Sequence, residues 1–140
     1  MGRFDASLLD GEQLFYRLLQ GIVPSGVKVV GDLDPNTAAQ IPSVMFSVIV
    51  AQEGNANGLW LATLTLTFLD HTEDAFDNAS EIYKGIYGWE DPTQGIVPGV
   101  GAVEEIVQEM TAFSRLGGEV PMETKTVSQY QGSWQFLVRN

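Results

Sequence analysis

The chain has 140 residues, of which 44% are hydrophobic, and a formal net charge of −11 at pH 7 from 18 acidic and 7 basic residues. This length and composition predict a single domain, residues 1–140, with enough apolar side chains for a buried core. The acidic excess disfavours nucleic acids and anionic membrane surfaces as ligands, because both need clustered lysine and arginine, and the lack of cysteine excludes disulfides and thiolate metal sites.

The N-terminal residues predict no targeting or membrane segment. Residues 1–5 lack an apolar signal core, and no apolar run in the chain approaches the roughly 20 residues of a membrane span. We therefore expect synthesis in the cytosol and no membrane partner.

Residues 7–20 predict the first helix, because leucine and phenylalanine recur there at spacings of three and four. The helix begins either at Ser7 or after Asp10, since Asp10 and Gln13 form a capping-box pattern. Residues 27–30 predict a short strand, and residues 32–36 predict a turn.

Residues 43–69 predict a long hairpin, with the loop Gly54–Gly58 between its two strands. Side chains alternate along a strand, so one face of the second strand is apolar and core-forming. The other face carries Leu59, Leu61, Thr63, Thr65, Thr67 and Leu69. This threonine row has no charge, so we expect either a neighbouring subunit or the domain's second helix to cover it.

Residues 73–87 predict the second helix, with Thr72 as its N-cap and Gly88 at its end. Its apolar stripe, which we expect to face the core, consists of Ala75, Phe76, Ala79, Ile82, Tyr83, Ile86 and Tyr87.

The last third of the chain predicts a loop at 89–101, a turn at 117–121 and a strand at 125–139. Alternation in this strand puts Tyr130, Trp134, Phe136 and Val138 on one face and Gln129, Gln131, Gln135 and Arg139 on the other. Between the loop and the turn, residues 102–114 are ambiguous: the apolar spacing is helical, but the glycine-rich approach and the missing cap favour a strand. Together the elements predict an α+β fold, a single domain with a mostly antiparallel or mixed sheet, a long hairpin and two helices packed on it.

Catalytic patterns are weak in this chain. His71, the one histidine, lies among Asp70, Glu73 and Asp74 and suggests a metal or acid–base site, but a strand end before an acidic helix start explains the same residues. The glycine-rich residues 95–101 lack the lysine of a phosphate-binding loop. We therefore expect no catalytic, cofactor-binding or metal-binding residues and no enzyme activity.

Two further features are candidates for a partner interface. Trp89 lies in a loop beside Pro92 and is the best single candidate for an exposed anchor, because tryptophan is enriched at interface hot spots, while ordinary packing is the favoured alternative. Glu104, Glu105 and Glu109 form either a solvated acidic edge or a patch that faces a basic partner.

The order of elements resembles the tail terminator family of long-tailed bacteriophages. The resemblance rests on the helix sequence LFYRLL at residues 14–19, the strand start PSVMF at 42–46, the long hairpin and amphipathic helix that follow, and the ending WQFLVR at 134–139. It covers most of the chain as a pattern.

The resemblance implies a structural virion protein that forms a ring, a hexamer in that family, at the head-proximal end of the tail tube. Such a ring ends tube polymerisation and offers the surface to which the head joins. The implied partners are other copies of the chain, the tail tube protein and a head-completion or connector protein, while DNA passes through the channel without specific binding. The implied location is the virion, and the host cytoplasm during assembly.

Alternative functions remain open from the sequence. The chain could be another head–tail connector, a head-completion protein or a tail-tube protein. It could also be an acidic domain that binds a basic protein, or a metal-dependent enzyme that uses His71.

Overall fold

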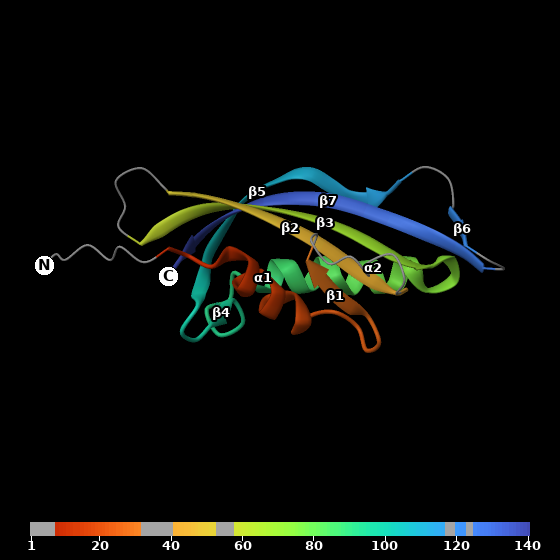
Figure 1. The fold of residues 1–140 in the computed structure, drawn as a ribbon, viewed down its shortest axis with the longest axis horizontal. Coiled ribbons are helices and arrows are strands. Elements are labelled where there is room, and N and C mark those ends of the chain that lie inside the picture. The colour runs from red at the N-terminus through yellow and green to blue at the C-terminus, as the bar shows by residue number, and fades with distance from the viewer. Residues whose placement is uncertain (1–7, 32–40, 53–57, 117–119, 123–124) are drawn as a thin grey trace, which may run out of the picture.

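A computed structural model describes residues 8–31, 41–52, 58–116, 120–122 and 125–140. In chain order the elements are α1 (Gly11–Gln20), β1 (Lys28–Gly31), β2 (Ser43–Gln52), β3 (Leu59–His71), α2 (Thr72–Gly88), β4 (Ile96–Val97), β5 (Gly101–Arg115), β6 (Val120–Met122) and β7 (Lys125–Arg139). One mixed sheet and two helices share a hydrophobic core, which confirms the predicted α+β class (Figure 1). The predicted turn at 32–36, most of the Gly54–Gly58 loop, Ser7 as a helix start and residues 117–119 of the last turn lie outside the described residues.

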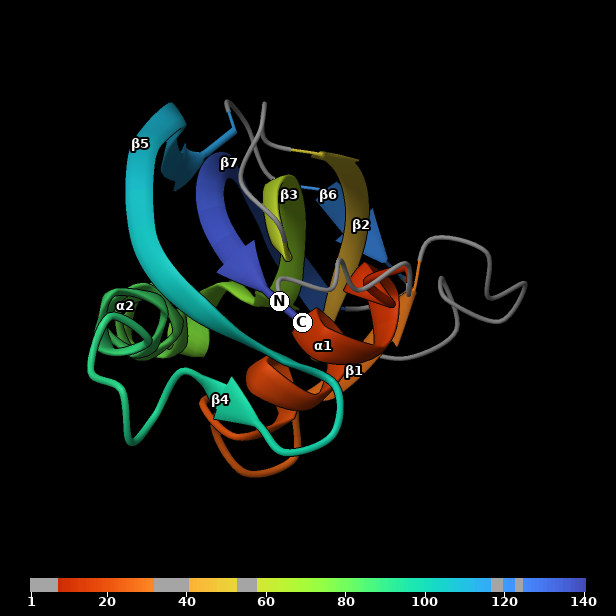
Figure 2. The same ribbon diagram turned by 90° about the vertical axis from the view of Figure 1, so that its left-hand side faces the viewer.

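The strands follow the order β1-β2-β3-β7-β5-β4, and β6 also pairs with β7. β1 runs parallel to β2, and every other pair is antiparallel. Both helices lie on the same face of this curved sheet, as Figures 1 and 2 show from two directions. We call this face the inner face and the opposite one the outer face.

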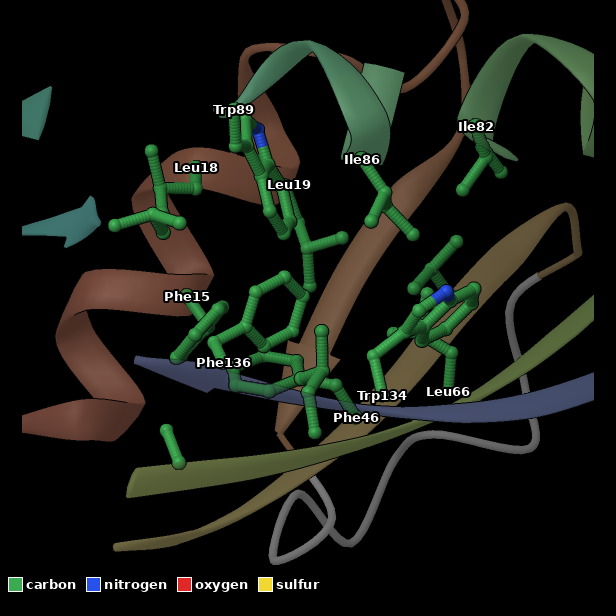
Figure 3. Packing of buried hydrophobic residues seen from close by; sticks show 14 of the residues in the cluster. Phe15, Leu18, Leu19, Phe46, Leu66, Ile82, Ile86, Trp89, Trp134 and Phe136 are labelled. Carbon is green, nitrogen blue, oxygen red and sulfur yellow. The ribbon is translucent and has the colours of Figure 1, made fainter. Parts of the chain in front are cut away.

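The core fills the space between the inner face and the helices. Phe15 of α1 lies at its centre, with ring centroids 5.1 Å from Phe136 and 5.8 Å from Trp89 (Figure 3). The inner-face residues of β3 are fully buried: Ala62, Leu64, Leu66 and Phe68. In β7, Trp134, Phe136 and Val138 are buried in the same way, so the predicted alternation is confirmed in both strands.

Helix α1 begins after Asp10, which is the second of the two predicted starts. The Asp10 carboxylate accepts a 3.0 Å hydrogen bond from the backbone N–H of Gln13 and so caps the first turn. The buried face of the helix consists of Gly11, Leu14, Phe15, Leu18 and Leu19.

Strands β2 and β3 form the predicted hairpin in unbroken antiparallel register, with Ser47 opposite Thr65 and Ile49 opposite Thr63. β3 in turn pairs with β7 along its whole length. The sheet therefore has a regular centre of three long strands.

The junction of β3 and α2 differs from the prediction. β3 continues to His71 because its last residue pairs with Val127 of β7, so His71 takes the N-cap position of α2. Thr72 as N-cap was therefore wrong: its hydroxyl lies 2.9 Å from Ser128 Oγ and is hydrogen-bonded to it. Buried Asp70 joins strand and helix, accepting hydrogen bonds from the His71 backbone N–H and from Asn78 Nδ2, both at 2.7 Å.

β5 confirms that residues 102–114 form a strand, and its irregularity explains their helical spacing. The register against β7 shifts between Val103 and Glu105, Ile106 and Gln108, Glu109 and Thr111, and Thr111 and Ser114. Each β-bulge inserts one extra residue, so inward-facing positions recur at intervals of about three instead of two. The extra residues Val107 and Met110 are accordingly exposed.

Phe15 provides a test of this core. Phe15→Ala is expected to lower the free energy of unfolding by about 3–5 kcal/mol, because it leaves a cavity between Trp89 and Phe136. The control is Leu8→Ala, which removes a side chain that is 83% exposed and should change stability by less than about 0.5 kcal/mol. Urea denaturation measures both, and equal losses would contradict the packing described.

Candidate functional site

The outer face of the sheet is without charge over its three central strands up to Arg139 at the end of β7, and Glu105 of β5 lies beside this area. Its three central strands contribute Met45, Ser47, Ile49 and Ala51 from β2, Leu61, Thr63, Thr65, Thr67 and Leu69 from β3, and Gln129, Gln131, Ser133, Gln135 and Leu137 from β7. Ile49 is 72% exposed, and the threonines of β3 are half-buried. None of these positions carries a charge, although the chain as a whole has a net charge of −11.

One of the two predicted coverings for this face is wrong. The domain's second helix does not lie over the threonine row, because α1 and α2 both pack on the inner face (Figure 2). The row itself, Leu59 to Leu69, stands on the outer face as its alternation predicted, and its residues are partly exposed.

The sheet also has an open edge along β2. β1 pairs only with Ser43–Phe46, so residues 47–52 have no strand beside them on that side among the described residues. Bulges and charged residues usually keep an edge strand from pairing with another chain. Residues 47–52 have neither.

The predicted acidic patch at Glu104, Glu105 and Glu109 does not exist as one surface. The bulges of β5 turn the three side chains to different environments. The Glu104 carboxylate forms an ion pair with Arg139, Glu105 lies opposite Leu137 on the outer face, and Glu109 lies on the inner side against α2.

Glu109 is the centre of a polar and aromatic cluster. Its Oε1 accepts hydrogen bonds from the hydroxyls of Tyr83 and Tyr87, both at 2.7 Å. Its Oε2 accepts a 2.9 Å hydrogen bond from the backbone N–H of Phe113. Two turns of α2 and the last bulge of β5 therefore hold this carboxylate in one orientation.

These contacts shift the pKa of each group in the cluster. Partial burial alone would raise the pKa of Glu109, but the hydrogen bonds from Tyr83, Tyr87 and Phe113 outweigh it and hold the pKa below its ordinary value of 4.5. The hydrogen bond to Glu109 raises the pKa of Tyr83 from 10.0, and burial followed by the same carboxylate raises that of Tyr87. The carboxylate is therefore ionised and both tyrosines are neutral at pH 7.

Phe113 fills the space above a glycine. A Cβ on Gly132 of β7 would lie 2.8 Å from the Phe113 Cα, so only glycine allows the bulged strand to approach this closely. Phe113 consequently lies between Tyr130 and Trp134, with ring centroids 5.9 and 5.6 Å away. It also stacks on Tyr83 at 6.3 Å with an interplanar angle of 8°.

A hollow of about 360 Å³ opens between α2 and the far end of β5, and we call it the α2–β5 hollow. Its lining consists of Phe76, Ala79, Ser80, Tyr83, Lys84, Glu109, Ala112, Phe113 and Tyr130. Phe76 at the rim is 69% exposed, although it is a large apolar side chain. The hollow thus combines aromatic rings with one oriented carboxylate.

A larger hollow, of about 640 Å³, lies at the end of the sheet where β4, the start of β5 and Asn140 meet. Arg139 and Glu104 both line it, and their charges are paired with each other. The glycine-rich residues 95–101 contribute β4 and the turn at Gly99 (φ 81°) to its wall.

Trp89 is not an exposed anchor, and that prediction was wrong. The side chain is 1% exposed and packs in the core against Phe15 and Phe136, with both ring centroids 5.8 Å away. The chain turns inward directly after α2, where the Trp89 backbone N–H donates to the Ile86 carbonyl at 3.1 Å. The turn points the indole from the end of α2 into the core, toward Phe15 and Phe136 (Figure 3).

His71 ends β3 and precedes the acidic first turn of α2. This is the strand end before an acidic helix start that the sequence predicted as the alternative to a metal or acid–base site. Among the described residues, no group of three or more histidine, cysteine, aspartate or glutamate side chains is placed to hold a metal ion. Neither of the helices in that part of the chain is both long enough and apolar enough to cross a lipid bilayer.

The α2–β5 hollow was missed from the sequence because its aromatic residues were assigned to the core-facing stripe of α2. In the structure, Ala75, Ala79, Ile82 and Ile86 face the core. Phe76, Tyr83 and Tyr87 form a second, partly exposed line beside them. The available signal was the width of the stripe, which exceeds what a single buried helix face needs.

Comparisons of the chain with protein-family models and with curated proteins find no match.

Alkaline titration tests the Glu109 cluster. The pKa of Tyr83 is raised above its ordinary value of 10.0 in the folded state. The stability that Tyr83 contributes is therefore fully present below pH 10.0 and is lost as the pH rises through the raised, folded-state pKa. Glu109→Gln removes the negative charge that opposes tyrosinate formation, so part of the tyrosinate absorbance should appear at lower pH than in the unmodified protein. Glu105→Gln, on the opposite face, should leave the curve unchanged, and identical curves for all three proteins would contradict the cluster.

Proposed function

We propose that this chain is a structural virion protein that forms a ring at the head-proximal end of a phage tail tube. In this role it ends tube polymerisation and provides the surface for head–tail joining. The observation that carries the proposal is the uncharged central part of the outer face, formed by β2, β3 and residues 129–137 of β7, supported by the open edge of β2.

The outer face has the composition of a subunit interface. Charged residues are depleted at the centres of protein interfaces, because an unpaired charge there loses its hydration. Copies of a chain with net charge −11 repel one another, so they can approach most closely through a surface that carries no charge. The threonine row at Thr63, Thr65 and Thr67 lies in the middle of such a surface.

The open edge of β2 supports association of identical chains in the same region. Its residues 47–52 belong to the same strand that contributes Ile49 to the outer face. An interface that covered both the face and the edge would protect unpaired backbone groups together with exposed apolar side chains.

The fold is consistent with the family that the sequence resembles, which is a small α+β domain with a long hairpin. The net charge of −11 suits a channel through which DNA slides without binding. The proposed partners are therefore other copies of the chain in a hexameric ring, the tail tube protein and a head-completion or connector protein. Virion and host cytoplasm are the proposed locations.

A second candidate function is an acidic domain that binds a basic protein. The exposed side of α2 favours it, since Glu73, Asp74, Asp77 and Glu81 lie along that helix with a single basic residue, Lys84.

Deletion of the gene from the phage that carries it tests the proposed role. Electron microscopy of the lysate should show tails of abnormal, extended length that fail to join heads. Supplying the gene from a plasmid should restore normal particles. Tails of normal length that still join heads in the deletion strain would overturn the proposal.

A charge on the outer face should impair assembly more than folding. Thr65→Lys places an ammonium group in the middle of the threonine row, where an interface would have to bury it. Complementation of the deletion phage should then fall strongly, while the melting temperature of the purified chain stays close to the original. Gln20→Lys, which adds the same charge at the exposed end of α1, is the control and should complement fully. If Thr65→Lys complements normally, or unfolds the chain, the outer face is not the interface.

A further inference from the structure

We infer that the α2–β5 hollow binds a basic side chain, arginine or lysine, of a partner polypeptide. The inference is independent of the proposed ring, because it rests on the contacts of Glu109 and on the aromatic lining. It concerns the inner side of the sheet near α2, away from the outer face.

The carboxylate of Glu109 is held in one orientation by its hydrogen bonds and can accept a further hydrogen bond. A carboxylate offers about four acceptor positions, and Glu109 uses two on Oε1 and one on Oε2. All of these donors are neutral groups. The ion pair found in the described part of the chain joins Glu104 to Arg139, so the negative charge of Glu109 has no basic partner there.

The rings around this carboxylate suit the rest of a basic side chain. Tyr83 and Phe113 stack in parallel, and the exposed ring of Phe76 stands at the rim. Cations are attracted to aromatic faces, and the methylene stems of arginine and lysine pack on apolar surface. The hollow therefore offers a place for the stem and a counter-charge for the head group.

The charge around the hollow favours a basic partner over an acidic one. Acidic residues outnumber the single lysine on α2, and the whole chain carries −11. Lys84 lines the hollow and opposes an incoming cation. Its long stem allows the ammonium group to extend into water, so it weakens binding without preventing it.

The occupant is inferred to be part of a polypeptide because the rim is hydrophobic. Phe76 lines the same hollow as Glu109 and is 69% exposed, so it presents an apolar ring that a small hydrated ion would not cover. Residues that flank an arginine or lysine in a peptide would cover this ring, as aromatic residues are covered at other protein interfaces.

The experiment uses the full chain, labelled with ¹⁵N, and three acetylated and amidated peptides. Their sequences are Gly-Ser-Arg-Ser-Gly, the same peptide with lysine, and the same peptide with citrulline, a neutral analogue of arginine. Saturable amide shifts at Ser80, Ala112 and Phe113 are expected with the arginine or lysine peptide and not with citrulline. Comparison of the dissociation constants of the arginine and lysine peptides shows whether the hollow prefers a guanidinium or an ammonium group.

Matched variants decide whether Glu109 is responsible. Glu109→Gln should weaken binding about tenfold, because it removes the charge at the contact. Glu105→Gln removes an equal charge from the opposite face and should change affinity less than about twofold. Lys84→Ala should strengthen binding, since it removes a like charge from the lining.

Phe76→Ala is a second test variant, which is needed if the Glu109→Gln variant does not fold. Phe76 is 69% exposed, so its removal leaves the core intact, and it should weaken binding of the basic peptide while thermal melting is unchanged. If Glu109→Gln fails to fold, Phe76→Ala decides alone. Equal binding of the citrulline peptide, equal effects of Glu109→Gln and Glu105→Gln, or no effect of Phe76→Ala would overturn the inference.

Discussion

The repeated bulges of β5 are the constraint on which the inner side of this molecule depends. Each extra residue bends the strand, and together the bulges curve β5 from the side of β7 past α2 to β4, as the end-on view shows (Figure 2). The same bulges turn Glu109 toward α2 and bring Phe113 over Gly132. Without them β5 would be a straight edge strand, and neither the aromatic cluster nor the hollow beside it would form.

The two faces of the sheet have opposite chemistry, and each suits a different kind of contact. The inner face meets both helices through apolar side chains, with the hydrogen-bonded carboxylates of Asp70 and Glu109 at the α2 side. The outer face is uncharged and partly exposed across β2, β3 and residues 129–137 of β7. A neutral surface suits an identical, equally acidic chain, whereas a carboxylate among aromatic rings suits a basic side chain. The two proposed interactions can therefore occupy one molecule at the same time.

Regular elements were predictable here, and irregular ones were not. Strict alternation identified β3 and β7, and apolar spacing with a capping pattern identified α1, because these signals arise within a few residues of each other. The prediction was wrong for Thr72 and for Trp89, whose positions depend on partners distant in sequence. Pairing with β7 extends β3 past the expected helix start, and packing between Phe15 and Phe136 draws the indole inward.

The sequence by itself determined the α+β class, the hairpin, the two-sided character of β3 and the absence of charge on its outer row, since all of these follow from local residue order. Only the tertiary structure decided which face the helices cover and how the acids at 104, 105 and 109 are separated. A bulge changes the direction of every side chain after it, and its position depends on the partner strand rather than on the bulged residues alone. For the same reason the pairing of Glu109 with Tyr83 and Tyr87 could not be read from a helix stripe and a strand considered separately.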